Sequence, residues 1–397
     1  MTAGGYTSKN SYEQWLAWKH GAQLRERALR WRMAEQPQDP DHLDWGDQAL
    51  LENSVALIRA NARQLVEHFY ADLFNRLPGV RKLFPSDMAP QRDRLLTALL
   101  ALVESGPALA PVLAQLGRDH RKFSVREVHY AAVGDALVAA LTAFSGEHWT
   151  PAVEHAWRAR YTAAAKIMTT AAATDDQPPF WYASVVDRSP CGDNVAILRL
   201  RPHRPYAYTA GQYATIESPR LPRVWRAYSM ATPPRFGKPL EFHIRALGHG
   251  GLSDVLVKAE PGDTVRLGPP QGTISLGSDP AQPRLFVAGG TGWSMIKALL
   301  GQHVRERSAP ATLLASFRPG EPYDPAFDDF VHELPRVETR LVHDADQLRA
   351  ALSPDRLPSP FLNAYVSGPP GLIDSAVRLL ATAGVGKTHI YFDNLVH

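Results

Sequence analysis

The chain has 397 residues, of which 45% are apolar and 21% charged, and its formal net charge is +3. This length predicts two or three domains with sizeable hydrophobic cores. A net charge so close to zero argues against nucleic acid or an anionic membrane as a partner. The single cysteine, Cys191, excludes an internal disulfide and a thiolate cluster for zinc or iron–sulfur.

The N-terminus is polar and lacks the apolar core of a signal peptide. Charged residues interrupt each candidate run of about 18 apolar residues. We therefore expect a cytoplasmic protein that does not insert into a membrane. The oligomeric state stays open, and a monomer is compatible with the sequence.

Residues 1–46 precede the first clear domain pattern. Tyr12 to Gln36 contains no proline and combines basic residues with three tryptophans, which predicts a helix that ends at residues 37–41. Two interpretations stay open for this extension. It is either a surface helix that packs its aromatic side chains on the next domain, or a docking arm for a partner.

Residues 47–174 have the pattern of an all-α domain. Apolar residues recur at steps of three and four, as in Leu51, Val55, Ile58 and Ala62, and no alternating pattern interrupts them. The last predicted helix runs from Pro151 to about Ala173. The polar and proline-rich residues 174–179 then predict a linker.

Residues 180–278 predict a small antiparallel β-barrel. Short segments with alternating apolar residues are separated by turn residues, as in 182–186, 195–200, 213–216 and 240–244. Residues 282–397 instead alternate strands with helices. This second pattern predicts an α/β domain with a parallel sheet and helices on both faces.

The run Arg226-Ala227-Tyr228-Ser229 combines a cation, a planar ring and a hydroxyl. On a strand, Arg226 and Tyr228 share one face. The ring suits stacking on a flavin, the guanidinium suits a diphosphate, and the hydroxyl suits a flavin nitrogen. Four residues alone favour an ordinary strand end, and it is the neighbouring motifs that favour the flavin site.

Glycine turns follow two of the predicted strands in the α/β domain. Gly289–Gly292 lies between a strand and a helix, where glycines let backbone amides approach a diphosphate at the positive end of the helix. Ser367-Gly368-Pro369 follows a second strand of the same sheet. Because both turns fall at carboxyl ends of strands, the pair predicts a dinucleotide-binding crevice.

Residues 180–397 resemble the ferredoxin–NADP reductase superfamily. Four motifs occur in that family's order and approximate spacing: 208–213, 226–229, 289–292 and 367–370. The resemblance implies FAD on the barrel and NAD(P)H on the α/β domain. The FAD-binding residues that it implies are Tyr213, Arg226, Tyr228, Ser229, Gly250, Gly251 and Ser253. The residues that it implies for the nicotinamide cofactor are Gly289, Gly290, Thr291, Gly292, Gly368 and Pro369.

Residues 47–174 resemble the globin domain of flavohaemoglobins, in which a globin precedes this type of reductase. The matching runs are 68–70, 83–84, 91–92, 120–123 and 130–134. The resemblance implies haem b with His120 as the proximal iron ligand, which leaves the opposite iron position open for O2. It implies that Tyr70 and Gln91 donate hydrogen bonds to bound O2, that Phe84 packs on the haem and that Tyr130 supports His120.

The sequence departs from the flavohaemoglobin pattern at three places. Ala172 falls where the family has a glutamate that increases the basicity of the proximal histidine, unless another acid such as Asp119 replaces it. Leu395 falls where an aromatic residue shields the flavin. Trp293-Ser294-Met295 replaces the usual proline-containing start of the helix after the glycine turn.

The resemblance implies a nitric oxide dioxygenase, in which NAD(P)H reduces FAD, FAD reduces the haem, and nitric oxide and O2 become nitrate. Two alternatives stay open: a haem-based oxygen or redox sensor, and an NAD(P)H-dependent flavin or haem reductase without nitric oxide turnover. The choice between NADH and NADPH is also open. Arg318, after a predicted strand, suits a 2′-phosphate but equally an exposed strand end.

Overall fold

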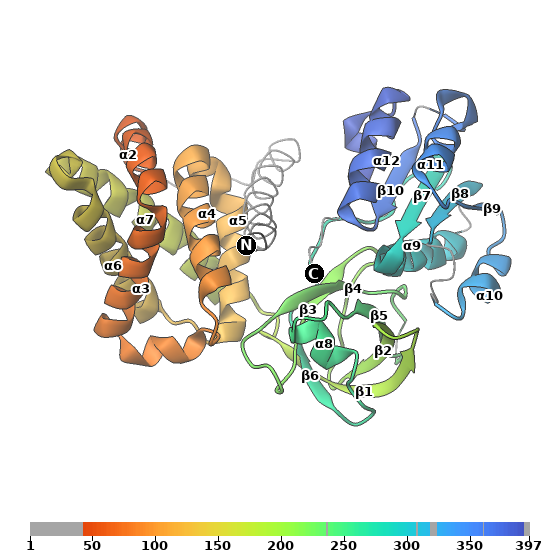
Figure 1. Cartoon of the computed structure of the whole chain (residues 1–397), viewed down its shortest axis with the longest axis horizontal. Helices are drawn as coiled ribbons and strands as arrows, with labels where there is room; N and C mark the ends of the chain where they lie inside the picture. Colours follow the sequence, from red (N-terminus) through yellow and green to blue (C-terminus); the bar gives the residue numbers. More distant parts are fainter. Residues whose placement is uncertain (1–42, 236, 307–308, 318–323, 360, 393–397) are drawn as a thin grey trace, which may run out of the picture. The chain divides into compact units, whose positions relative to one another are not determined.

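The computed structural model describes residues 43–397 apart from 236, 307–308, 318–323, 360 and 393–397. The expected N-terminal helix, Arg318 and Leu395 therefore lie outside the described residues. The chain divides into two compact units, Met1–Pro179 and Phe180–His397. Figure 1 shows the helices of the first unit, and the barrel and the α/β domain of the second.

The first unit is helical throughout the part that the structure describes, as the apolar periodicity predicted. Its α-helices are α2 (Gln48–Ala60), α3 (Ala62–Arg76), α4 (Ala89–Ser105), α5 (Ala110–His120), α6 (Glu127–Ser145) and α7 (Pro151–Thr174). Asp47 begins α2, because its carboxylate accepts hydrogen bonds from the amides of Ala49 and Leu50. Fully buried side chains such as Leu51, Leu65 and Trp157 form the core.

Two helical stretches of this unit, 89–123 and 127–148, are long and apolar enough to cross a membrane by length and composition. We expected charged residues to interrupt every such run. A stretch with one or two charged residues still counts as long and apolar enough. Leu99, Val103, Leu137 and Leu141 from these stretches are buried in the helical core. Core helices have the same composition as membrane spans, so the finding is weak evidence for a membrane protein.

The second unit begins with the predicted antiparallel sheet. Its strands are β1 (Trp181–Pro190), β2 (Val195–Pro202), β3 (Tyr213–Glu217), β4 (Arg226–Ser229), β5 (Leu240–Arg245) and β6 (Thr264–Leu267). Their order is β4-β3-β6-β1-β2-β5. A bridge between Met230 and Phe242 connects the two edges and nearly closes the barrel (Figure 1). The sequence analysis had not identified β6 or the short helix α8 (Leu252–Leu256).

The rest of the second unit is the predicted α/β domain. Its five strands are β7 (Arg284–Gly289), β8 (Ala311–Ser316), β9 (Val337–Leu341), β10 (Asn363–Ser367) and β11 (Ile390–Phe392). All neighbouring pairs are parallel, in the order β11-β10-β7-β8-β9. The helices are α9 (Trp293–Arg305), α10 (Phe327–His332), α11 (Ala345–Ala351) and α12 (Pro370–Thr382).

Helices cover both faces of this sheet (Figure 1). Phe286 and Leu313 pack with α9 on one face, whereas Val287 and Val366 pack with α11 and α12 on the other. The strands are therefore buried on both sides, which explains why they have continuous apolar sequences. The predicted fold class, a helical domain followed by an antiparallel barrel and a parallel α/β domain, is confirmed.

Candidate functional site

His120 ends helix α5 and has the hydrogen bonding of a metal-binding imidazole. Its Nδ1 atom lies 2.7 Å from the carbonyl oxygen of Leu116, so Nδ1 carries the proton and donates. Nε2 is then the atom with the free lone pair, which is the form that binds iron. Burial lowers the pKa of the imidazole, although the Leu116 carbonyl and the Asp119 carboxylate oppose this shift. The net lowering by burial favours the neutral imidazole.

Tyr130, in helix α6, lies beside His120 as the resemblance implied. The two ring centroids are 6.3 Å apart, and the ring of Phe123 lies 6.5 Å from the imidazole. The Tyr161 hydroxyl donates to the Tyr130 carbonyl at 2.6 Å, which fixes the backbone at this point of α6. Leu116, one helical turn before His120, is 38% exposed and adds an apolar surface on which a porphyrin can pack.

Helix α7 passes the end of α5 without presenting a carboxylate at residue 172. Gly117 packs against Met168, and Arg121 forms a 2.6 Å ion pair with Asp175. Ala172 lies between these two α7 contacts. Among the described residues, Asp119 is the acidic group that raises the pKa of His120. The His120 imidazole consequently has a carbonyl, not a carboxylate, on Nδ1, which would make it a weaker electron donor to a metal.

The structure brings Tyr70, Gln91 and Phe84 together in a second cluster of the helical unit. The hydroxyl of the buried Tyr70 donates to the Gln91 carbonyl oxygen at 3.1 Å. The Tyr70 ring lies 5.6 Å from that of Phe84, and both contact Phe74. Burial raises the pKa of the Tyr70 hydroxyl despite the nearby Arg94 and Arg92, so it remains a hydrogen-bond donor at neutral pH.

The predicted flavin-binding residues of β4 lie at one edge of the barrel sheet. Strand pairing places Ser229 opposite Tyr213 and Tyr228 opposite Ala214. A pocket of about 170 Å³ has seven lining residues: Arg226, Tyr228, Leu247, His249, Gly251, Leu252 and Ser253. Four residues assigned to FAD by the resemblance thus line one cavity, which combines a cation, an aromatic ring and a hydroxyl. The Tyr213 hydroxyl donates instead to the side-chain oxygen of Gln271 at 3.0 Å.

The loop beside this pocket is organised by Asp254, which the sequence analysis missed. Its carboxylate accepts hydrogen bonds from the amides of Gly248 at 2.9 Å, His249 at 2.8 Å and Gly251 at 3.1 Å. These amides keep the pKa of the Asp254 carboxyl below its usual range. Because these three amides already bind Asp254, they are not available to a ligand of the pocket, whereas the Ser253 hydroxyl lines it. The available signal was an acid directly after the Gly-Gly-Leu-Ser run.

The two glycine turns of the α/β domain are packed directly against each other. Parallel pairing of β7 with β10 brings their carboxyl ends together, with Ala288 opposite Ser367. A Cβ atom on Gly292 would lie 2.4 Å from the Gly368 nitrogen, and one on Gly289 would lie 2.3 Å from a Leu372 methyl group. Only glycine permits this approach. Both turns therefore lie at the same carboxyl edge of the parallel sheet, as predicted, and α9 begins directly after Gly292.

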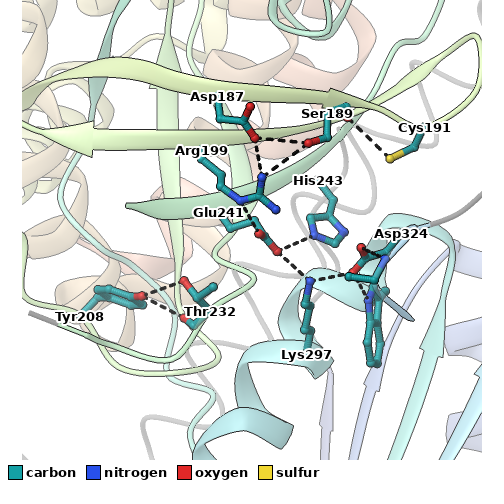
Figure 2. Close-up of polar contacts among 12 residues, drawn as sticks. Asp187, Ser189, Cys191, Arg199, Tyr208, Thr232, Glu241, His243, Lys297 and Asp324 are labelled. Carbon is teal, nitrogen blue, oxygen red and sulfur yellow. Dashed lines mark hydrogen bonds and ion pairs between the residues drawn. The ribbon is translucent and has the colours of Figure 1, made fainter. Parts of the chain in front are cut away.

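A buried polar cluster connects the barrel with α9 (Figure 2). Lys297 Nζ lies 2.8 Å from a carboxylate oxygen of Glu241 and 2.7 Å from one of Asp324. His243 also contacts Glu241, at 3.1 Å. Burial alone would raise the pKa of both carboxyls, but hydrogen bonds and the charge of Lys297 outweigh it and leave both pKa values lowered.

Glu241, His243 and Asp324 also place possible metal-binding atoms within 4.8 Å of one another. The Lys297 ammonium already bridges the two carboxylates, so the cluster contains its own cation. No motif in the sequence had pointed to this cluster. Its members come from β5, α9 and a loop, and only folding brings them together.

Comparisons with known proteins match both units. A globin family model matches residues 67–168, and an oxidoreductase FAD-binding domain model matches residues 183–276. A flavohemoprotein of Bordetella parapertussis is 26% identical over 279 residues, which cover 64% of this chain and 69% of that protein. A flavohemoprotein of Chromobacterium violaceum is 23% identical over 393 residues. The aligned region covers 87% of this chain and 96% of that protein.

One solved structure resembles the fold over most of the chain. The flavohemoglobin of Malassezia yamatoensis, solved with bound FAD and heme, has a TM-score of 0.71 at 17% identity. The similarity covers 88% of this chain and 98% of that one. At this identity the likeness establishes a shared fold, with the helical unit and the reductase unit in the same order.

Proposed function

We propose that this chain, a flavohaemoglobin in which a globin domain is fused to an NAD(P)H-dependent FAD oxidoreductase, converts nitric oxide and O2 to nitrate. When bound, NAD(P)H supplies a hydride, FAD separates its two electrons, and haem iron activates O2. The remaining chemistry depends on how the residues of this chain hold and orient these groups.

The observation that carries the proposal is the geometry of His120. Its hydrogen bond to the Leu116 carbonyl selects the tautomer whose Nε2 binds iron, and it fixes the orientation of the ring. Tyr130 and Phe123 limit the movement of the imidazole. In this proposal, His120 would hold the iron of haem b through Nε2 of its single imidazole.

The aromatic cluster around Tyr70 supports a role in oxygen chemistry. A phenol that stays protonated in an apolar environment is a strong donor to an oxygen ligand, whose bound form has partial negative charge. We assign this role to Tyr70 and, through its side-chain amide, to Gln91. Phe84 packs against Tyr70 and excludes water from this region.

In the reductase unit, the pocket at β4 suits the flavin. Of its lining residues, we assign Arg226 and Ser253 to the diphosphate and Tyr228 to stacking on the ring system. Ser229, at the end of β4 outside the pocket lining, is assigned to a flavin nitrogen. The turns at Gly289–Gly292 and Gly368–Pro369 place backbone amides at the end of the sheet for NAD(P)H. We further propose a cytoplasmic location and small-molecule partners, O2 and nitric oxide.

A haem-based sensor is the second candidate, and Ala172 favours it. An imidazole bonded to a carbonyl pushes less electron density to iron than one bonded to a carboxylate. A weaker donor at His120 would favour reversible ligand binding over turnover. A sensor would therefore retain His120 and Tyr70 but show little turnover.

The decisive experiment measures nitric oxide consumption by protein loaded with haem and FAD, under air, with NADH or NADPH. The proposal predicts consumption that requires the nicotinamide cofactor and O2 and yields nitrate. Replacement of His120 by Ala should abolish the haem Soret band, whereas replacement of the exposed His155 should not. Fully loaded protein that binds O2 reversibly without nitrate formation would instead support the sensor.

A further inference from the structure

Strand β5 carries a polar row on the face that points away from the barrel core. Phe242 and Ile244 point inward and belong to the core. Glu241 and His243, at the alternating positions, point outward. They are nevertheless only 6% and 3% exposed. Buried polar groups need hydrogen-bond partners. One partner of Glu241 is Lys297, which belongs to the α/β domain.

Lys297 connects the two domains through this row. Its ammonium donates both to Glu241, on the barrel, and to Asp324, in the α/β domain, as Figure 2 shows. Asp324 also accepts a hydrogen bond from Trp293 Nε1 at 3.1 Å. Residues 293 and 297 are one helical turn apart at the start of α9. The first turn of this helix is thus held by one carboxylate from each domain.

The turn at Gly290–Gly292 immediately precedes this anchored helical turn. Farther along the same face of β5, Arg245 brings a guanidinium nitrogen to 4.0 Å from the Cβ position of Gly290. The outward row of β5 therefore runs beside the turn assigned to NAD(P)H. The barrel that carries β5 also carries the flavin pocket at Arg226 and Tyr228.

We propose that Lys297 is a positioning residue for hydride transfer, because the Glu241–Lys297–Asp324 bridge sets the spacing between the nicotinamide-binding turn and the flavin-binding barrel. The proposal rests on the reductase function and is independent of nitric oxide turnover. Hydride transfer requires the reacting atoms to be roughly 3–3.5 Å apart, and a misplacement of about 1 Å can slow a reaction by roughly 100-fold. A charged bridge between two domains supplies a directional constraint that apolar contacts lack.

The remaining contacts of α9 with the barrel keep the helix docked without Lys297. The Cβ position of Gly211 lies 3.1 Å from a Leu299 methyl group, and that of Gly301 lies 3.0 Å from the Pro233 ring. Arg305, at the end of α9, donates to the Pro234 carbonyl at 2.8 Å. This last contact also crosses between the domains but lies far along the helix from the glycine turn, which makes Arg305 a matched control.

The variant must remove the bridge without leaving a buried carboxylate unpaired, since such a charge can unfold the protein. We therefore combine Lys297→Met with Asp324→Asn. Glu241 then keeps Arg199, whose Nε lies 3.1 Å away, and His243. The carboxamide introduced at position 324 still offers an oxygen to Trp293. Lys297→Arg alone tests whether another cation restores the bridge, and Arg305→Gln is the control.

Two measurements test the proposal on FAD-loaded full-length protein. Anaerobic stopped-flow mixing with NADH or NADPH gives the rate of flavin reduction and the Kd of the nicotinamide cofactor. Hydrogen–deuterium exchange over residues 289–297, without NAD(P)H, reports the order of the turn. For the double variant we expect flavin reduction about tenfold slower and a Kd changed by less than about threefold. Exchange over 289–297 should be faster and FAD content unchanged.

Lys297→Arg should recover most of the rate, and Arg305→Gln should resemble the parent protein. A parent-like rate and exchange pattern in the double variant would overturn the proposal. An equal loss in Arg305→Gln would also overturn it, because the effect would then reflect general domain docking. A parent protein whose FAD neither NADH nor NADPH reduces would instead refute the reductase function, and this proposal with it.

Discussion

Gly117 of α5 lies so close to α7 that a Cβ atom at this position would be 2.1 Å from the carbonyl oxygen of Met168. The contact lies one turn before His120 and so fixes where this histidine lies along α7. Helix packing at backbone distance is possible here only because residue 117 has no side chain.

Replacement of Gly117 by Ala is therefore expected to push α5 away from α7. Overpacking of this kind costs about 1–3 kcal/mol of unfolding free energy. Urea unfolding followed by circular dichroism measures the cost, and the haem Soret band reports the displacement of His120. Gly79→Ala is the control, because no atom of the described residues lies within 4 Å of its Cβ position. Equal stability of the two variants would contradict the packing argument.

Tyr70→Phe should release O2 faster in the haem-loaded protein. If the hydroxyl donates to bound O2, loss of a hydrogen bond to a partly charged acceptor costs about 1.5–3 kcal/mol, which corresponds to roughly 10- to 100-fold in rate. Stopped-flow measurement of O2 dissociation tests this expectation. In the structure the Tyr70 hydroxyl donates to the Gln91 backbone carbonyl, so this expectation requires it to turn from that carbonyl to O2. The exposed Tyr182 lies on the barrel strand β1, so Tyr182→Phe should leave the rate unchanged. Equal changes would show that Tyr70 is not the donor.

Asp254→Ala should weaken FAD binding even though it removes a negative charge beside the diphosphate site. The carboxylate orders the loop by accepting three amide hydrogen bonds, and the loop lines the flavin pocket. Fluorescence titration of the flavin-free protein gives the change in Kd, which we expect to be about tenfold for the loss of a charge-assisted contact. Tighter binding in the variant would show that charge repulsion dominates.

The same loop predicts a pH dependence. The folded-state pKa of Asp254 is lowered, so its contribution to loop order is present above the ordinary aspartate range near about pH 4 and is lost as the pH falls through the lowered value. Asp254→Asn should remove this acid-dependent step in FAD release while leaving other transitions. A titration of flavin fluorescence at constant ionic strength measures it. Identical acid profiles for both proteins would contradict the assignment.

Arg160 should be essential for the stability of the helical unit. Its buried guanidinium donates to the Trp45 carbonyl at 2.6 Å, the Leu102 carbonyl at 2.7 Å and the Gln48 side chain at 2.8 Å. Arg160→Met leaves two carbonyls without these donors and should cost about 2–4 kcal/mol. Arg158→Met removes exposed ion pairs with Glu154 and Asp135 and should destabilise the unit much less. Thermal unfolding of the two variants tests the difference.

The sequence was informative wherever a signal is local along the chain. Steps of three and four predicted the helical unit, alternation predicted most of the barrel, and strand–helix order predicted the parallel sheet. These periodicities follow from the geometry of each element and need no knowledge of its neighbours. The motif around His120 likewise pointed to the residue whose Nδ1–carbonyl contact the structure displays. Strand β6 (Thr264–Leu267) was not predicted, although it is as long as the 213–216 segment that alternation did indicate.

Only the tertiary structure decided which distant residues meet. Lys297 and Glu241 are 56 positions apart, and neither has a neighbouring residue that indicates a partner. The glycines at 292 and 368 looked like phosphate-binding turns, but their close packing on each other became visible only when β7 and β10 were paired. The sequence by itself determined the elements and the candidate ligands, because these depend on local backbone geometry. Packing decided the rest: the Glu241–Lys297–Asp324 bridge and the hydrogen bonds of Asp254 with its loop amides. A buried polar group is costly without a hydrogen bond, and only the folded chain determines which partner lies close enough.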